Sequence, residues 1–286
     1  MTAGKKVLVT GGSGDLGGTL CRKAAAVGYA VTATYLTRPE RIVAGTPAKI
    51  DLTDREALAA LLDEVQPDVV FHTAVPPLNT PNLRGSILTT AFNLRDLCPK
   101  TTRLIFLSTD MIFDGTKAPY KDDDPPSPLS TYGLAKAEME GVADTVVRTS
   151  LIYDFVAGNK QVDWMLERIQ KGERVKLFSD EYRCPIWTET LAEALLELGE
   201  SIVKGILNVA GAESITRLEL GWKILEAFDY DPERYIEAIS AESTGRPADL
   251  TLDVSKAQLV LKTKLLTVDE ALAKFRGESA SAQAKD

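Results

Sequence analysis

Histidine and cysteine are scarce in this sequence of 286 residues. His72 is the single histidine, and the three cysteines, Cys21, Cys98 and Cys184, lie far apart without a CxxC pair. No cluster of His, Cys and carboxylate residues has the spacing of metal ligands, which argues against a metal site. We expect His72 to end a strand near a functional site, and the cysteines to be reduced thiols that pack in the interior.

Long apolar runs and runs of positive charge are also missing. No apolar stretch approaches the roughly 18 residues that cross a bilayer. A formal net charge of −8 argues against electrostatic binding to nucleic acid or to an anionic membrane surface. The chain begins with a strand-like segment and not with a signal peptide. These absences predict a cytoplasmic protein whose partners are small molecules or proteins.

The first half of the chain alternates two kinds of segment. Short apolar runs rich in β-branched residues (KKVLVT, AVTATYL, DVVFHTA, RLIFLS) are each followed by a helical pattern. Such alternation indicates βαβ units and a parallel sheet covered on both faces. The sequence therefore predicts an α/β fold with a doubly wound parallel sheet. After about residue 155 the alternation loosens, which suggests a smaller lobe built onto the sheet.

A glycine-rich segment, VLVTGGSGDLGG, follows the first predicted strand and opens a helix. Gly11, Gly14 and Gly17 would let the backbone turn tightly and approach a pyrophosphate, whose charge a helix N-terminus favours. No GK[ST] follows, so a P-loop is excluded. The segment predicts a dinucleotide site that includes Asp15 and Leu16, against the alternative of an ordinary glycine-rich turn. We expect the Asp15 carboxylate to face solvent, because it would repel a phosphate.

The end of the second predicted strand bears on the choice of dinucleotide. Domains that prefer NAD usually carry an acidic residue there, whereas this strand ends in YLTR with no acid before Glu40. Arg38 can pair with a 2′-phosphate. This favours NADP(H), with NAD(H) as the alternative if Arg38 is only an exposed loop arginine.

Further cofactor contacts are expected after the next two strands. Asp51 and Leu52 are candidates to touch the adenine, and Asp51 is equally a candidate cap for the following helix, in competition with Thr53. Thr73 and Ala74, which follow the strand DVVFH, are candidates on the cofactor side.

The segment STYGLAKAEME places Tyr132 and Lys136 four residues apart in a helical pattern, and hence on one face. An ammonium near a phenol lowers the pKa of the tyrosine from its ordinary value of about 10. Such a tyrosine exchanges a proton with a carbonyl oxygen or an alcohol. Ser108 and Thr109 end the strand RLIFLS and would supply a hydroxyl that orients the carbonyl, unless they simply form a turn.

Several segments together resemble a known family. TGGSGDLG, STDMIFDG, YGLAK, VVRTSLIY and GRPADLTLDVSK are similar to the extended short-chain dehydrogenase/reductases, and among them to the dTDP-4-dehydrorhamnose reductases, from about Lys5 into the 270s. The resemblance implies a catalytic triad of Thr109, Tyr132 and Lys136, with Lys136 also bonding the nicotinamide ribose. It further implies an NAD(P)-binding Rossmann domain over 1–155, completed by sheet and helix elements from the later chain. A mainly substrate-binding lobe over 156–276 would follow. The low-complexity segment GESASAQAKD separately predicts a disordered tail over 277–286.

Four residues are candidates for substrate binding. Asp110 and Met111 follow Thr109 directly, and Arg183 and Arg246 are possible diphosphate clamps because a guanidinium fork matches phosphate oxygens. Surface salt bridges are the alternative for both arginines. The family usually has an aromatic residue at the position of Met111, and an AAYT-like stretch where this chain has HTAVPPLN at 72–79.

The sequence thus predicts an NAD(P)H-dependent reductase, preferring NADP(H), that transfers a hydride to a keto group of a nucleotide-activated sugar. Two alternatives remain open. One is a non-catalytic, dinucleotide-binding regulatory subunit that resembles the methionine adenosyltransferase beta subunit. The other is a reductase of a small non-nucleotide carbonyl, which the altered substrate-side segments suggest. A homodimer is a further expectation, because paired helices form dimers in many members of this superfamily.

Overall fold

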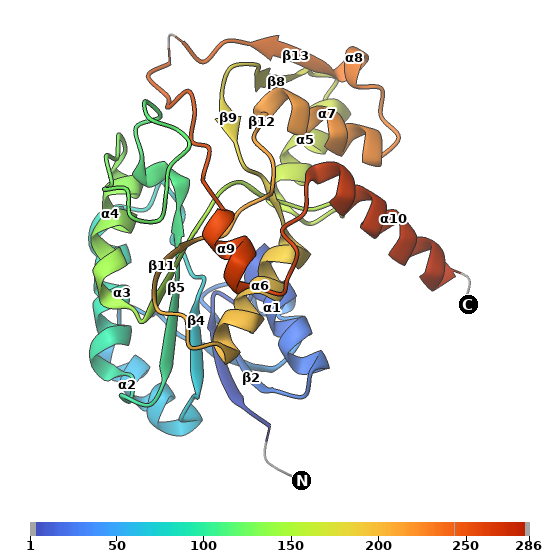
Figure 1. Cartoon of the computed structure of the whole chain (residues 1–286). Helices are drawn as coiled ribbons and strands as arrows, with labels where there is room; N and C mark the ends of the chain where they lie inside the picture. Colours follow the sequence, from blue (N-terminus) through green and yellow to red (C-terminus); the bar gives the residue numbers. More distant parts are fainter. Residues whose placement is uncertain (1–3, 243, 284–286) are drawn as a thin grey trace.

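The apolar runs of the first half form most of a seven-stranded parallel sheet (Figure 1). In the computed structural model, which describes residues 4–242 and 244–283, the strand order is β11-β6-β5-β4-β1-β2-β3. The strands are β1 (Lys6–Thr10), β2 (Ala30–Tyr35), β3 (Thr46–Lys49), β4 (Val69–His72), β5 (Arg103–Thr109), β6 (Thr145–Thr149) and β11 (Gly205–Asn208). The strand order reverses direction between β1 and β4, and ligands of such sheets bind in the crevice at this point.

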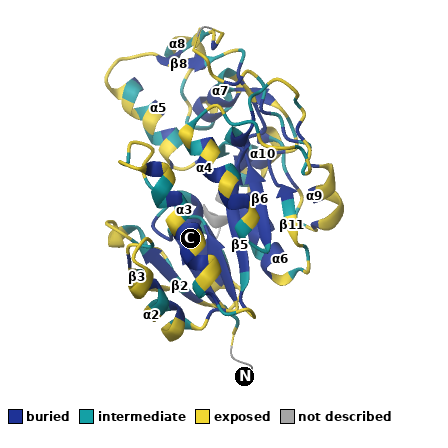
Figure 2. Cartoon of the chain, turned by 90° about the vertical axis from the view of Figure 1, so that its left-hand side faces the viewer, coloured by how far each residue is buried: buried dark blue, intermediate teal, exposed yellow. Residues whose placement is uncertain are grey.

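Helices cover both faces of the sheet because successive side chains of a strand point to opposite sides. Val7 and Val9 of β1 pack in one cluster with α1 (Asp15–Ala26) and α6 (Thr188–Glu200). Leu8, between them, packs in another with α2 (Arg55–Val65), α3 (Leu83–Leu97) and α4 (Thr131–Met139). The central strands are buried while the outer sides of the helices are exposed (Figure 2). The predicted α/β, doubly wound fold is confirmed.

A third apolar cluster forms a lobe at the end of the sheet where the strands finish (top of Figure 1). Tyr153, Phe155 and Trp187 are buried there, so Trp187 is a packing residue. The lobe pairs β8 with β13, β7 with β10 and β9 with β12. Its elements are β7 (Ile152–Tyr153), α5 (Lys160–Gln170), β8 (Val175–Phe178), β9 (Tyr182–Arg183), β10 (Ile186–Trp187), β12 (Ile215–Thr216), α7 (Arg217–Ala227), α8 (Pro232–Tyr235) and β13 (Ile236–Ile239).

Parts of the later chain return to the Rossmann sheet. α6 packs on α1, β11 extends the sheet beside β6, and α9 (Ser255–Val260) lies against β11. Within the described residues, the connections also contain the 3-10 turns η1 (Pro39–Arg41), η2 (Asp110–Ile112) and η3 (Glu140–Val142).

The C-terminal segment differs from the expectation of a disordered tail over 277–286. The last helix, α10 (Val268–Gln283), continues through most of that stretch. Its sequence there, GESASAQ, contains alanine, glutamate and glutamine, which favour the helix once Val268 and Ala271 have anchored its first turns in the core. Residues 284–286 lie outside the described residues.

The three cysteines are buried and form no disulfide with one another. Burial raises the pKa of each thiol to about 12, so none is a reactive thiolate. Among the described residues, no cluster of histidine, cysteine and carboxylate side chains is able to hold a metal ion. None of the described helices is long and apolar enough to cross a membrane.

Candidate active site

The glycine loop joins the end of β1 to the start of α1. Gly11 has a φ of +74°, and a Cβ there would lie 2.8 Å from the Cα of Ala74. A Cβ on Gly17 would lie 2.1 Å from the carbonyl oxygen of Gly11, so the helix and the loop touch backbone to backbone. Gly14 is the N-cap of α1 and caps without a side chain. The loop therefore presents bare backbone at a helix N-terminus, the arrangement that suits a pyrophosphate.

Asp15 does not face solvent as expected. Its carboxylate pairs with the Arg41 guanidinium at 2.8 Å and accepts the backbone N–H of Lys160 at 3.0 Å. The contact ties the first turn of α1 to η1 and to the start of α5 in the lobe. Arg41, which sequence reasoning missed, gives Asp15 the opposite charge that makes a half-buried position favourable. Arg38 is exposed, and its side chain has no hydrogen bond or ion pair within the described part of the chain.

Neither proposed cap of α2 is the actual one. The Asp54 carboxylate accepts from the backbone N–H groups of Glu56 and Ala57, and Asp54 is therefore the N-cap. Asp51 accepts from both the N–H and the hydroxyl of Thr53, which forms a tight polar turn just outside the helix. Asp51 is exposed and Leu52 half-buried, at the sheet edge beyond β3.

Thr73 and Ala74 lie against the glycine loop. The Thr73 hydroxyl donates to the carbonyl of Thr10 at 2.7 Å, and the Ala74 N–H reaches the Thr10 hydroxyl at 3.4 Å. The same hydroxyl contacts Nδ1 of His72 at 2.8 Å. Burial, with the nearby charge of Lys136, lowers the pKa of His72 to about 3. His72 is thus a neutral residue that holds the end of β4 beside β1.

The structure brings Thr109, Tyr132 and Lys136 together at the ends of β5 and α4. The Lys136 Nζ lies 6.0 Å from the centre of the Tyr132 ring and donates to the carbonyl of Leu107 at 2.8 Å. A Cβ on Gly133 would lie 2.1 Å from the carbonyl oxygen of Met111, so α4 packs closely on η2. This close packing fixes the tyrosine next to the end of β5.

Of the two hydroxyls at the end of β5, only Thr109 is near the tyrosine. Ser108 is buried and donates to Glu140, which pairs with the buried Arg148. Thr109 is on the opposite side of the strand, and its side chain is close enough to Tyr132 to oppose the rise in the pKa of the phenol. It also caps η2 by accepting the Met111 N–H at 3.2 Å. Thr109 is therefore the hydroxyl that is able to act with the phenol.

The pKa of Tyr132 moves in the direction opposite to the one expected from the Lys136 charge. Burial, followed by the negative charge of Asp110, raises the pKa of the phenol to about 12, although Thr109 and Arg183 oppose the rise. Lys136 points its ammonium at a backbone carbonyl and not at the phenol. Tyr132 is consequently a neutral phenol at physiological pH, the form that donates a proton to a carbonyl oxygen.

Burial of the Lys136 ammonium lowers the stability of the folded protein, and this effect should depend on pH. Burial lowers the pKa of its ammonium to about 8, from 10.5 in an unfolded chain, although Glu140 opposes the shift. Between pH 8 and pH 10.5 the unfolded chain binds more protons than the folded one, so the free energy of unfolding should rise with pH in this range. Below pH 8 the lysine is charged in both states, and the destabilisation by its burial applies in full. We expect Lys136→Met to be more stable than the unaltered protein at pH 7, with a difference that narrows from pH 8 to 10.5. Urea unfolding of both proteins across this range, without added ligand, measures the difference; a constant difference would contradict the account.

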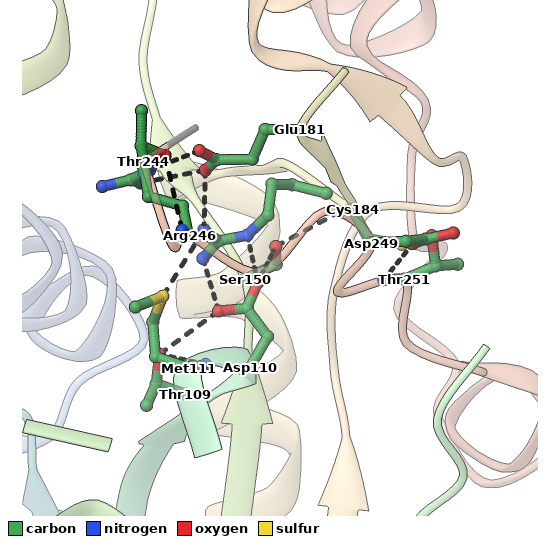
Figure 3. Close-up of polar contacts among 11 residues, drawn as sticks. Thr109, Asp110, Met111, Ser150, Glu181, Cys184, Thr244, Arg246, Asp249 and Thr251 are labelled. Atoms are coloured by element: carbon green, nitrogen blue, oxygen red, sulfur yellow. Dashed lines mark hydrogen bonds and ion pairs between the residues drawn. The ribbon is translucent and has the colours of Figure 1, made fainter. Parts of the chain in front are cut away.

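Three of the four candidate substrate residues, Asp110, Arg183 and Arg246, are joined through Glu181 in an ion-pair network (Figure 3). Asp110 is fully buried; it accepts Nε of Arg183 at 2.7 Å and also the hydroxyl of Ser150. The second carboxylate, Glu181, accepts Nη1 of Arg183 at 3.3 Å and Nε of Arg246 at 2.6 Å. The chain of contacts runs from the lobe surface at Arg246 down to the residue beside Thr109.

This network corrects the expectation for Arg183. Its guanidinium donates hydrogen bonds to Asp110 and Glu181, and the residue is only 4% exposed. Arg183 is therefore neither a free diphosphate clamp nor a surface salt bridge. Arg246 has a side chain 41% exposed and pairs with Glu181, so it remains accessible to a ligand. The half-buried Met111 contacts Arg183 through its sulfur at 3.6 Å. Sequence reasoning missed Glu181, although its place two residues before Arg183 puts both on one side of an extended segment.

Comparisons with a family model, with curated proteins and with solved structures place this chain near the same group of proteins. The family model described as the RmlD substrate binding domain matches residues 5–280. A probable dTDP-4,6-dihydroxy-2-methyloxan-3-one 4-ketoreductase of Streptomyces antibioticus is 30% identical over 84% of this chain and 83% of its own length. The methionine adenosyltransferase 2 subunit beta of Xenopus tropicalis is 26% identical over 90% and 83%. A crystal structure of a hypothetical dTDP-4-dehydrorhamnose reductase from Sulfolobus tokodaii has a TM-score of 0.76 at 29% identity, covering 93% of this chain and 98% of that one.

Proposed function

The chain belongs to the family of the RmlD substrate binding domain, and from this premise we propose that it is an NADP(H)-preferring reductase of the extended short-chain dehydrogenase/reductase type. Its substrate is a keto group on a nucleotide-activated sugar. The observation that carries the proposal is the convergence of Thr109, Tyr132 and Lys136 at the carboxyl edge of the sheet, two strands from β1, which the glycine loop follows. The Streptomyces relative, named as a dTDP-sugar ketoreductase, supports the substrate class.

The residues around the loop fit a nicotinamide dinucleotide. Gly11 and Gly17 let the loop pack against Ala74 and against α1 where a Cβ would collide, and the N-terminus of α1 favours a pyrophosphate. Gly14, Asp15 and Leu16 complete the loop, with the Asp15 charge neutralised by Arg41. Asp51, Leu52, Thr73 and Ala74 would contact the adenosine and nicotinamide halves, and Arg38 the 2′-phosphate.

When it is bound, the reduced cofactor supplies the hydride that converts the ketone to an alcohol. Tyr132 holds the proton at its phenol oxygen and gives it to the carbonyl oxygen of the substrate. Thr109 orients that carbonyl oxygen with its hydroxyl. Lys136, one turn further along α4, would hold the nicotinamide ribose. The raised pKa of Tyr132 keeps the proton on the phenol until a carbonyl oxygen arrives.

Two alternatives are weaker. A regulatory subunit, by analogy with the methionine adenosyltransferase relative, would not need a complete Thr-Tyr-Lys set beside a glycine loop. A reductase of small carbonyls would not need arginines at the lobe surface, where Arg246 is exposed. A homodimer and a cytoplasmic location remain predictions from the sequence.

The proposed function is tested by adding NADPH and a panel of dTDP-, UDP- and GDP-4-keto sugars, and by following absorbance of the reduced nicotinamide. We expect oxidation of NADPH that depends on one keto sugar, with turnover falling when the nucleotide is removed from the substrate. Equal turnover of the free keto sugar would favour the small-carbonyl alternative. Tight NADPH binding without turnover on any sugar would favour the regulatory one.

Arg38→Ala tests the cofactor preference. A charged hydrogen bond to a 2′-phosphate is worth enough that NADPH affinity should fall about 10- to 100-fold, while NADH affinity stays unchanged. Calorimetric titration of both cofactors measures the two affinities. Arg95→Ala, which removes an exposed arginine paired with Asp96 on α3, is the matched control. If Arg41→Ala shows the selective loss and Arg38→Ala does not, the assignment passes to Arg41.

A further inference from the structure

Glu140 is a buried carboxylate at the end of α4 that takes no part in the proton transfer described above. The residue is 8% exposed, and it accepts the hydroxyl of Ser108 at 2.7 Å. Nε and Nη2 of Arg148 donate to its two oxygens at 3.0 and 2.8 Å. Because a buried charge is stable only with such partners, these contacts fix the position of the Glu140 carboxylate.

The Arg148 guanidinium is itself held from the other side. Its Nη1 donates to the carbonyls of Lys121 and Asp122, at 3.3 and 3.0 Å. The guanidinium also lies 5.1 Å from the centre of the Phe113 ring. All three nitrogens of the group therefore have acceptors, and Arg148 holds Glu140 in one place.

Glu140 and Lys136 are neighbours on one face of α4. They are four residues apart, and the backbone of Glu140 is still helical, with a φ of −63° and a ψ of −24°. Two successive residues of β5 bind them. The Lys136 ammonium donates to the carbonyl of Leu107 at 2.8 Å, and the Ser108 hydroxyl donates to Glu140. The carboxylate is thus held beside the ammonium by the strand that ends in Thr109.

Within residues 4–242 and 244–283, the other titratable groups on the elements around Lys136 offer it no free negative charge. They are the neutral His72 on β4, the neutral phenol of Tyr132 on α4, and Asp110 after β5, which is paired with Arg183. Burial lowers the pKa of Lys136, and the Glu140 charge opposes this fall. Glu140 is therefore the group that favours the charged form of the lysine.

We propose that Glu140 is a positioning residue whose carboxylate, fixed by Arg148, keeps Lys136 as a charged ammonium in the site. Glu140 acts through Lys136 and not on the substrate or cofactor directly. A charged ammonium donates stronger hydrogen bonds than a neutral amine, so its hold on the nicotinamide ribose depends on this carboxylate. The inference rests on the proposed function, because it assigns the charge of a residue in the same site.

The first test is NADPH oxidation by Glu140→Gln, with the keto sugar that the unaltered protein reduces, from pH 6 to pH 9. At pH 9 turnover should be about tenfold lower, because a fall of about one unit in the pKa of Lys136 changes its charged fraction about tenfold. At pH 6 the lysine is charged in both proteins, so turnover should agree within about twofold. The KM for the keto sugar should not change at either pH.

Two variants serve as references for this test. Glu140→Asp keeps the charge and should recover most of the turnover at pH 9. Glu138→Gln removes a carboxylate of the same helix that pairs with Arg84 at the surface, and it should behave as the unaltered protein does. If Glu140→Gln lost the same fraction of turnover at every pH, the carboxylate would have only a structural role and the inference would be wrong.

The second test is urea unfolding, which needs no substrate. The stability difference between proteins with and without Lys136→Met should narrow above about pH 8 in the unaltered background. In the Glu140→Gln background the narrowing should begin about one pH unit lower, because the pKa of the lysine falls only in the folded state. An identical pH range in both backgrounds would overturn the inference.

Glu140→Gln leaves the Arg148 charge unpaired and is itself destabilised. If this variant does not fold, Glu140→Gln combined with Arg148→Met removes the unpaired charge and still lacks the carboxylate, so it should show the same shift in both tests. Absence of keto-sugar turnover in every protein would count against the proposed function alone. An unchanged pH range of unfolding, with turnover present, would remove the inference alone.

Discussion

Tyr132→Phe is expected to bind NADPH as tightly as the unaltered protein and to reduce its keto substrate about 10²- to 10⁴-fold more slowly, the usual contribution of a positioned general acid. In the proposed mechanism the phenol donates the proton, and its pKa, raised to about 12 mainly by burial, keeps it protonated at neutral pH. Removing one oxygen leaves the ring packed against the apolar cluster that α2, α3 and α4 share. The measurement is the rate of NADPH oxidation at saturating substrate, together with the NADPH dissociation constant.

The same pKa predicts how the rate depends on pH. Because the phenol remains protonated through the alkaline range, loss of its proton should not slow reduction between pH 7 and 10. Tyr230→Phe, a change to a half-buried tyrosine of the lobe, is the control for loss of a hydroxyl elsewhere. If Tyr132→Phe kept more than a tenth of the turnover, another group would have to be the acid.

Arg183→Met is expected to destabilise the protein by about 3–5 kcal/mol, the typical effect of removing one partner from a buried ion pair. Asp110 is fully buried and Glu181 is 1% exposed, so Asp110 loses its main partner in the interior, while Glu181 keeps Arg246. Arg168→Gln at the surface should change stability by less than about 1 kcal/mol. Urea unfolding at neutral pH gives both values.

A double variant separates the ion pair from simple packing. Arg183→Met combined with Asp110→Asn removes the unpaired charge beside Thr109, and it should be less destabilised than the sum of the two single changes. Additive effects in this cycle, or a loss below about 1 kcal/mol in Arg183→Met alone, would show that the pair does not stabilise the site.

The parts of the site that depend on local pattern were predictable from the sequence. The glycines after the first strand and the four-residue spacing of Tyr132 and Lys136 each follow from one secondary-structure element. The doubly wound sheet followed from the alternation of apolar runs and helical patterns in the same way, and the RmlD-type family was recognised from its motifs.

The ion pairs of the site could not be predicted from the sequence, because the paired residues lie far apart in the chain. Arg183 meets Asp110 across 73 positions, and Arg246 meets Glu181 across 65. Asp15 finds Arg41 only because η1 folds back over α1. Burial of Tyr132 outweighs every neighbouring charge in setting its pKa, and burial is a property of the assembled fold rather than of the YxxxK spacing.

The most direct test of the central claim is isotope transfer from NADPH that carries deuterium at the transferable position of nicotinamide C4. Incubated with the keto sugar that supports oxidation, the protein should yield an alcohol product with one deuterium on the former carbonyl carbon, detected by mass spectrometry. The same incubation with Tyr132→Phe should yield little of this product. Bound NADPH with no deuterium in any keto sugar of the panel would contradict the assignment of Thr109, Tyr132 and Lys136 as a reductase site.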